Sequence, residues 1–141
     1  MAKKRVLFVC IHNSGRSQMA EALLRHLAGD RFEAESAGFE PGTLNPVVVA
    51  SLKEIGIDIS KAKTKSVFDL RAQNREYDYV VTVCDESTAE RCPLFPGKSR
   101  RLHWSFKDPS SFQGTAAEKL AQTGAVRDQI KAKIEEFAAG A

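Results

Sequence analysis

The stretch RVLFVCIHNSGRSQMAEALLRHLA, residues 5–28, changes its hydrophobic pattern halfway along. Residues 5–10 form an apolar run rich in β-branched and aromatic side chains, which predicts a buried strand. Residues 16–28 repeat apolar positions with helical spacing, which predicts a helix. The apolar face of that helix contains Met19, Ala20, Leu23, Leu24 and Leu27. The sequence therefore predicts a strand, a short polar loop and a helix, with Cys10 at the end of the strand.

The rest of the chain alternates in the same way. Further strands are predicted over residues 32–38, 77–84 and, more weakly, 99–104, and further helices over residues 45–56 and along the C-terminal stretch. The apolar residues of the C-terminal helix are Val126, Ile130, Ile134 and Phe137. Gly124 is expected to break that helix or to delay its start. Alternating strands and helices are typical of an α/β fold, in which helices cover both faces of a parallel sheet.

Length and composition exclude several classes of protein. With 141 residues the chain is expected to form one domain, residues 1–141. A net charge of +3 suits a small anionic substrate better than nucleic acid, which binds to a concentrated basic stripe. The apolar run 6–11 is too short for a membrane span or a signal peptide. We therefore expect a cytoplasmic protein with reduced cysteines and with no nucleic-acid or membrane partner.

The loop after Cys10 has the composition of an oxyanion site. Its backbone N–H groups can converge in front of the helix, whose positive end favours a thiolate at Cys10. Arg16 offers a planar fork of donors to a tetrahedral oxyanion. Gly15 is expected to allow a tight turn, and Asn13 to tolerate unusual backbone angles. The predicted substrate-binding residues are Ile11, His12, Asn13, Ser14, Gly15, Arg16 and Ser17.

Two residues of this loop also have simpler interpretations. Ser17 either donates a hydrogen bond to the thiolate or only caps the helix. Cys10, taken alone, is a small buried hydrophobic residue. The combination of Cys10 with Arg16 in a strand–loop–helix context favours a nucleophile. The chain has neither G-x-x-x-x-G-K-[ST] nor G-x-G-x-x-G, so the loop is not a nucleotide cradle of those kinds.

A second pair of thiols, Cys84 and Cys92, flanks the polar segment 85–91. Cys84, like Cys10, ends a predicted strand, and ligands of parallel sheets bind at such ends. We predict a redox pair whose thiols meet when the segment rearranges. A zinc site that includes His103 is one alternative, although no C-x-x-C pair is present, and two unrelated buried cysteines are the other. We expect no metal and no cofactor.

Asp108 and Pro109 follow the last predicted strand, at the same edge of the sheet. Pro109 stiffens the backbone and can aim the Asp108 carboxyl at a leaving oxygen as a general acid, although Asp-Pro is also common in turns. The histidines have no evident catalytic role. His12 is a loop residue, His26 is expected to be solvated, and His103 is expected to be a packing residue.

Together these motifs resemble a known family. The matching segments are VLFVCIHNSGRSQMAEALLR, ESAGFEPGTLNPVVVASLKEIGIDIS, DYVVTVCDE, RCPLFPG, HWSFKDP and VRDQIKAKIEEF. They are similar to the thioredoxin-coupled arsenate reductases built on the low-molecular-weight tyrosine phosphatase fold. The C-x5-R-S loop alone is shared with the phosphatases, whereas the added Cys84 and Cys92 distinguish the reductases. The resemblance implies a three-layer αβα sandwich whose four-stranded parallel sheet has the order 2-1-3-4. We expect the chain to be a monomer.

The resemblance also implies a chemistry, the reduction of arsenate to arsenite in arsenic detoxification. In the implied mechanism Cys10 attacks arsenic while Arg16 and the loop amides hold the oxyanion, and Asp108 protonates a departing oxygen. Cys84 then attacks the Cys10 sulfur and releases arsenite. Cys92 in turn attacks Cys84, and thioredoxin reduces the resulting disulfide. The gap between Cys84 and Cys92 is one residue longer than in well-known members, which leaves glutaredoxin or another thiol reductant as alternatives.

Lys65 is a further departure from the family pattern. Some relatives have an acidic residue there that helps to hold a potassium ion, near residues that match Asn13, Glu21 and Ser36. Lys65 has no ligand oxygen on its side chain and brings its own positive charge. The resemblance therefore implies that this chain is indifferent to potassium.

Two other functions remain as alternatives. A low-molecular-weight protein tyrosine phosphatase needs only Cys10, Arg16 and Asp108. Such phosphatases usually carry tyrosines directly after Asp-Pro, where this chain has Ser110 and Ser111, and that difference favours the reductase. A non-enzymatic module that senses oxyanions or binds a partner would leave the general acid and the thiol pair without a role.

Overall fold

The computed structural model describes residues 3–84 and 92–141. Within them, parallel strands form one sheet in the order β2-β1-β3-β4. The strands are β1 (Lys4–Cys10), β2 (Phe32–Gly38), β3 (Tyr79–Thr82) and β4 (Arg100–His103). The predicted parallel sheet and its strand order are confirmed, although β3 and β4 are shorter than the sequence indicates.

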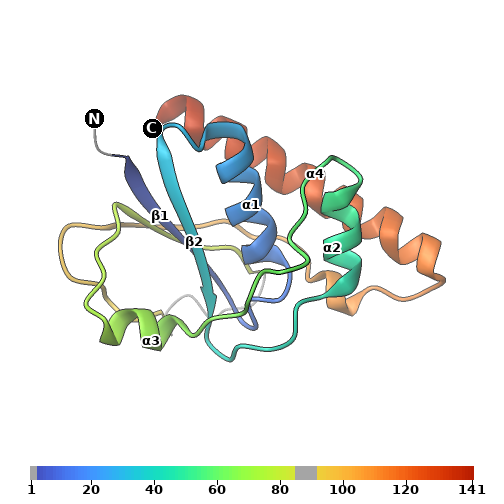
Figure 1. Ribbon diagram of the computed structural model, residues 1–141, viewed down its shortest axis with the longest axis horizontal. Helices are drawn as coiled ribbons and strands as arrows, with labels where there is room; N and C mark the ends of the chain where they lie inside the picture. The colour runs from blue at the N-terminus through green and yellow to red at the C-terminus, as the bar shows by residue number, and fades with distance from the viewer. Residues whose placement is uncertain (1–2, 85–91) are drawn as a thin grey trace.

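Helices cover both faces of this sheet (Figure 1). The helices α1 (Arg16–Ala28), α2 (Pro46–Lys53) and α4 (Ala116–Gly140) pack together on one face, and α3 (Val67–Ala72) lies on the other. A short 3₁₀ turn, η2 (Pro109–Ser111), follows β4. The three layers expected of the α/β fold are therefore confirmed.

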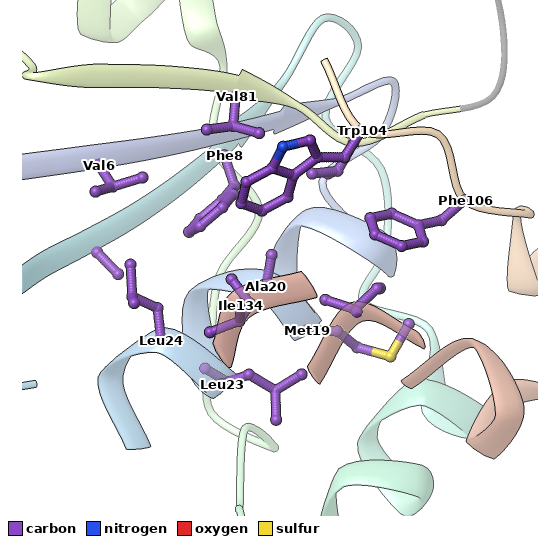
Figure 2. Packing of buried hydrophobic residues seen from close by; sticks show 14 of the residues in the cluster. Val6, Phe8, Met19, Ala20, Leu23, Leu24, Val81, Trp104, Phe106 and Ile134 are labelled. Carbon is purple, nitrogen blue, oxygen red and sulfur yellow. The ribbon is translucent and has the colours of Figure 1, made fainter. Parts of the chain in front are cut away.

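The period-two alternation of β1 divides the core between the two faces of the sheet. Phe8 and Cys10 belong to the cluster on the α1 and α4 side, which we call the first cluster. Leu7 and Val9 belong to the second cluster, on the α3 side. Figure 2 shows the first cluster, in which the Phe8 and Trp104 rings lie 5.9 Å apart and meet side chains of α1 and α4. Cys10 thus ends β1 on the side where α1 begins.

The expectation for Gly124 is wrong, because α4 runs through this residue. Thr115 and Glu118 form a reciprocal capping box that starts the helix well upstream of it. Gly124 also lies beneath the Arg127 side chain, whose nearest atom would be 3.6 Å from a Cβ at Gly124. The Arg127 guanidinium donates to the Ser51 carbonyl at 2.7 Å, and this bond joins α4 to α2.

Two other features of the helices differ from the expectation. Leu27 is 38% exposed instead of buried, because the buried side of the last turn of α1 shifts to Ala28. The helix α3 was not predicted, and it begins where the Ser66 hydroxyl accepts hydrogen bonds from the N–H groups of Phe68 and Asp69. A membrane-spanning helix is absent from the part of the chain that the structure describes.

Candidate active site

Cys10 occupies the junction between β1 and α1. Its side chain is 2% exposed, and its Sγ lies 3.2 Å from the Asn13 backbone nitrogen and 2.8 Å from the Ser17 Oγ. The Ser17 Oγ already accepts a hydrogen bond from Asn13 Nδ2 at 2.8 Å, so its own proton can point at the sulfur. The N-cap of α1 is Gly15, and no side chain caps this helix. The interpretation of Ser17 as only a cap is therefore wrong.

The loop between Cys10 and Arg16 turns its carbonyl groups outward. Every carbonyl from residue 10 to residue 15 accepts a hydrogen bond from a group outside the loop. The donors are the backbone N–H groups of Phe39, Glu40, Gly42, Asn45 and Met19 and the side-chain amide of Gln18. In a trans peptide the N–H points opposite to the C=O. The N–H groups of the loop therefore point toward the side where Asn13 meets the Cys10 sulfur, as an anion nest requires.

Asn13 supplies the unusual backbone conformation of this loop. Its φ is 54°, in the left-handed region that asparagine tolerates better than most residues. Its buried Oδ1 accepts hydrogen bonds from the Lys65 N–H at 3.0 Å and from Gln18 Nε2 at 3.2 Å. Gly15, the N-cap of α1, has a φ of −142° and a ψ of −88°, which is neither a helical nor a strand conformation. Sequence reasoning missed the brace formed by Gln18, because a glutamine is unremarkable in a helix.

Gly38, at the end of β2, allows the loop to approach the sheet. A Cβ on this residue would lie 2.7 Å from the Asn13 nitrogen and 2.7 Å from the Ile11 oxygen, which is closer than non-bonded atoms pack. Both of these neighbours are backbone atoms, which cannot swing aside as the tip of a flexible side chain can. From the sequence, Gly38 was predicted only to end a strand. Its contact with the loop could not be predicted, because the two segments are distant in the sequence.

Arg16 and Asp108 meet at the edge of the loop. The buried Arg16 side chain donates from Nη1 to the Phe106 carbonyl at 3.1 Å, and its Nη2 lies 3.6 Å from Asp108 Oδ2. The other carboxyl oxygen, Oδ1, accepts from the Ser110 N–H at 2.9 Å and caps η2. Asp108 is therefore a turn residue and also a carboxyl group beside Arg16. Its partial exposure leaves it able to exchange a proton with a bound group.

Cys84 lies beside the end of β1, whereas Cys92 belongs to the opposite face of the sheet. The Val83 N–H donates to the Val9 carbonyl at 2.9 Å, which places Cys84 one residue beyond the level of Cys10. Cys10 and Cys84 are members of the first cluster, and Cys92 is a member of the second. All three cysteines are free and buried. The segment 85–91, which was expected to rearrange, lies outside the described residues.

The groups around Cys92 shift the pKa of its thiol. Burial raises the pKa of Cys92, the neighbouring Cys84 raises it further, and the charge and hydrogen bond of Arg101 lower it. Among residues 3–84 and 92–141, no cluster of three or more His, Cys, Asp or Glu side chains is placed to hold a metal ion. The zinc alternative, which rested on these cysteines and His103, therefore has no support among those residues.

The three histidines are all exposed. His12 Nδ1 lies 2.9 Å from the Glu40 carbonyl oxygen, and His26 is solvated as predicted. The expectation for His103 is wrong. Its ring does not pack into the core and instead lies with Nδ1 2.6 Å from the Thr82 Oγ1.

Glu21, Ser36 and Lys65 come together beneath the loop. The Ser36 hydroxyl donates to Glu21 Oε1 at 2.7 Å, and the Lys65 Nζ lies 3.9 Å from the same oxygen. The backbone of Lys65 also donates to the Asn13 side chain. Arg25 approaches the other Glu21 oxygen at 3.5 Å. The carboxylate of Glu21 is therefore already balanced by cationic side chains of the chain itself.

Known proteins are similar to this chain over nearly its full length. Residues 5–140 match the family described as low molecular weight phosphotyrosine protein phosphatase. An arsenate reductase of Bacillus subtilis is 44% identical over 138 residues, which cover 98% of this chain and 97% of that protein. A solved thioredoxin-dependent arsenate reductase of Corynebacterium glutamicum is 33% identical with a TM-score of 0.61, over 96% of this chain and 63% of that one. The low molecular weight protein tyrosine phosphatase of T. tengcongensis shares the fold, with a TM-score of 0.78 at 23% identity over 99% of this chain and 100% of that one.

Substitution of Gly38 by alanine tests the packing of the loop. The added Cβ would push the backbone of the loop away from β2, so we expect weaker binding of inorganic phosphate, used as an oxyanion probe, and a loss of about 1–3 kcal/mol in the free energy of unfolding. Calorimetry and thermal denaturation measure the two effects. The control is Gly42→Ala, because a Cβ there would have 3.4 Å to its nearest neighbour. Unchanged phosphate binding in a folded Gly38→Ala protein would contradict this role.

The Glu21 cluster predicts little response to potassium. Because Lys65 places its ammonium group beside Glu21, exchanging sodium for potassium at fixed ionic strength should leave the melting temperature unchanged, since general screening is constant. Lys65→Asp removes this charge and adds ligand oxygens, so a potassium-dependent gain in melting temperature is expected in that variant. A clear potassium gain in the unmodified protein would show that Lys65 does not replace the ion.

Proposed function

The chain belongs to the low-molecular-weight phosphotyrosine protein phosphatase family, and we propose that it is an arsenate reductase of this family, which converts arsenate to arsenite and uses Cys10, Cys84 and Cys92 in sequence. The observation that carries the proposal is the placement of Cys10 at the end of β1 and of Cys84 just after the adjacent strand β3, in the same cluster, with Cys92 in the cluster on the opposite face. A phosphatase needs only the first of these thiols. The relatives named as arsenate reductases, which align over nearly the full length of the chain, support the same function.

The first step is the attack of Cys10 on arsenate. The inward-facing N–H groups of residues 11–16 and the Arg16 guanidinium would hold the arsenate oxygens. The Cys10 thiolate, which accepts the Asn13 N–H and can accept the Ser17 proton, forms a sulfur–arsenic bond. One arsenate oxygen departs as water, and Asp108 supplies the proton that makes it a good leaving group.

The second step is the reduction of arsenic. The Cys84 thiolate attacks the Cys10 sulfur, a Cys10–Cys84 disulfide forms, and the sulfur–arsenic bond breaks. Its electron pair stays with arsenic, which leaves as arsenite after a two-electron reduction. The position of Cys84, one residue beyond the level of Cys10 on the adjacent strand, supports this order of attack because the exchange needs the two sulfurs within bonding distance.

The third step frees Cys10. Cys92 attacks Cys84, which transfers the disulfide from Cys10–Cys84 to Cys84–Cys92 and makes the oxidised pair available to an external reductant. We propose thioredoxin as that reductant, with glutaredoxin or another thiol as the alternative. The name of the Corynebacterium glutamicum relative supports thioredoxin, since that protein is described as thioredoxin-dependent.

The setting of this chemistry follows from the three thiols. The relay starts from reduced cysteines, so we expect the chain to work in the cytoplasm, where thiols stay reduced. We also expect a monomer. In the described residues the large hydrophobic side chains that are exposed are Leu27, Phe68 and Leu94. Leu27 lies on α1, whereas Phe68 lies on α3, which covers the other face of the sheet.

The alternative function is a protein tyrosine phosphatase, which the shared fold and the Cys10, Arg16 and Asp108 geometry favour. A phosphatase reaction would give Cys84 and Cys92 no role. The chain also has no aromatic residues directly after Asp-Pro to stack on a substrate ring, because Ser110 and Ser111 stand there and form part of η2. An oxyanion-sensing module leaves even Asp108 without a task.

Arsenite production under three conditions tests the proposal. The purified chain receives arsenate with thioredoxin, thioredoxin reductase and NADPH, with glutaredoxin and glutathione, or without reductant, and p-nitrophenyl phosphate hydrolysis is measured in parallel. We expect sustained arsenite formation with thioredoxin and no more than one turnover without reductant. Sustained phosphatase turnover with no arsenite under any condition would instead establish the alternative.

Replacement of Cys10 by serine should abolish arsenate reduction. A serine hydroxyl stays protonated at neutral pH and is a far poorer nucleophile, so we expect a loss on the order of 10³-fold or more. Arsenite assays measure the loss, and circular dichroism with thermal denaturation verifies that the fold persists. Substantial arsenite production by well-folded Cys10→Ser protein would refute the assignment of the nucleophile.

The two other thiols should fail at different steps. Cys92→Ser should release one arsenite per chain and then stall as a Cys10–Cys84 disulfide, whereas Cys84→Ser should never form that disulfide. Peptide mass spectrometry after alkylation of free thiols distinguishes the two states. Sustained thioredoxin-driven turnover in either variant would contradict the proposed relay.

A further inference from the structure

The surroundings of Cys92 disfavour its thiolate form. Its side chain is 4% exposed, and its thiol donates a weak hydrogen bond to the Pro93 carbonyl at 3.7 Å. Burial raises the pKa of Cys92 and the adjacent Cys84 thiol adds to that effect. A thiol reacts in disulfide exchange as the thiolate. Some group must therefore favour the charged form of Cys92 if it is to attack a disulfide.

Arg101 is placed to do this. It pairs with Val80 of β3, a member of the second cluster that also contains Cys92. Its Nη2 donates to the Cys92 carbonyl at 3.0 Å. Its charge and a side-chain hydrogen bond both lower the pKa of Cys92, against the effect of burial.

The preceding residue lies on the other face of β4. Successive side chains of a strand point to opposite faces, and Arg100 accordingly lines a cavity with Leu102, Trp104 and Phe137 on the α4 side. Arg100 and Arg101 are therefore two exposed arginines on the same strand, of which only Arg101 is on the Cys92 side. Arg100 is a matched control for Arg101.

The other charged or titratable groups around the second cluster do not supply the same effect. Tyr77 belongs to the cluster, but its pKa is raised to about 12 by burial first and then by Glu35, so it is neutral near pH 7. Arg71 of α3 is directed to the Leu94 carbonyl. Within the described residues, the two groups that shift the Cys92 thiol electrostatically are Arg101 and Cys84.

We propose that Arg101 is the positioning residue for Cys92, holding its backbone and keeping a positive charge beside its sulfur while Cys92 attacks the Cys10–Cys84 disulfide. The inference rests on the proposed function. In this step a Cys84–Cys92 bond forms and the Cys10–Cys84 bond breaks. Cys92 contributes the electron pair of the new bond, and Cys10 leaves as a thiolate. No external oxidant or reductant takes part, because one disulfide replaces another.

The first test isolates the Cys92 thiol and does not depend on catalysis. In a Cys10→Ser/Cys84→Ser background Cys92 is the sole cysteine, and its rate of alkylation by iodoacetamide is measured against pH. Removing the adjacent positive charge with Arg101→Gln should disfavour the thiolate. We expect alkylation at pH 7 to slow roughly three- to tenfold, with the pH midpoint displaced upward. Arg101→Lys keeps the charge and should give an intermediate midpoint, while Arg100→Gln should match the parent.

The second test uses the protein with all three cysteines. Arg101→Gln should still release the first arsenite, because that turnover needs only Cys10 and Cys84, but the Cys10–Cys84 disulfide should persist and thioredoxin-driven turnover should slow. Arg100→Gln should behave as the unmodified chain. An unmodified chain that makes no arsenite would refute the proposed function, whereas the alkylation result would still decide the role of Arg101. Three results would overturn this inference. Arg101→Gln could leave the alkylation profile of Cys92 unchanged, or Arg100→Gln could slow alkylation by the same factor. Alternatively, Arg101→Lys could shift the pH midpoint as far as Arg101→Gln does.

Discussion

The peptide groups between Cys10 and Arg16 can converge on one anion only if their carbonyls find partners elsewhere. Four N–H groups between residues 39 and 45, the Met19 N–H and the Gln18 side chain satisfy that condition. An unpaired buried carbonyl would cost about 1–3 kcal/mol, and a loop with several of them would collapse onto its own N–H groups. The segment after β2 is therefore as much a part of the oxyanion site as the loop itself, and Gly38 is the residue that lets the two approach.

The same sheet edge serves the redox chemistry. Cys10 and Cys84 lie at the ends of adjacent parallel strands on one face of the sheet, and Cys92 belongs to the core of the opposite face. In the proposed relay the disulfide is passed away from the anion site, so the oxidised pair no longer includes the nucleophile. A phosphatase with the same fold needs no such path, since water completes its reaction. The difference between the two activities then depends on Cys84 and Cys92, and not on the loop that binds the oxyanion.

Much of this could be predicted from the sequence because its determinants are local. The change of hydrophobic period between residues 5–10 and 16–28 located β1, α1 and the loop, and the positive φ of Asn13 matched the expectation for its residue type. The determinants that were missed act between distant segments. In the sequence, Gln18 is an ordinary helix residue, and its role depends on hydrogen bonds to the Asn13 and Lys63 carbonyls that form only in the folded chain. Gly38 is in the same way an ordinary strand end in the sequence, and its role depends on the loop that packs against it.

Other errors have the same origin. Gly124 has a low helix propensity, but the Thr115 capping box and the packing of Arg127 override it. His103 lies on β4, where successive side chains point to opposite faces, so its ring lies on the other face from Leu102 and contacts Thr82. Arg101 carries no local pattern at all, because its relation to Cys92 exists only once β4 and the second cluster are assembled.

The central claim is that three thiols of one chain pass two electrons to arsenate. The most direct measurement is the stoichiometry of reduced protein mixed with excess arsenate in the absence of any reductant. The account predicts one arsenite per chain, the loss of two thiols per chain, and a Cys84–Cys92 disulfide with Cys10 free. Arsenite formed with all three thiols still titratable, or no arsenite from fully reduced and folded protein, would contradict it.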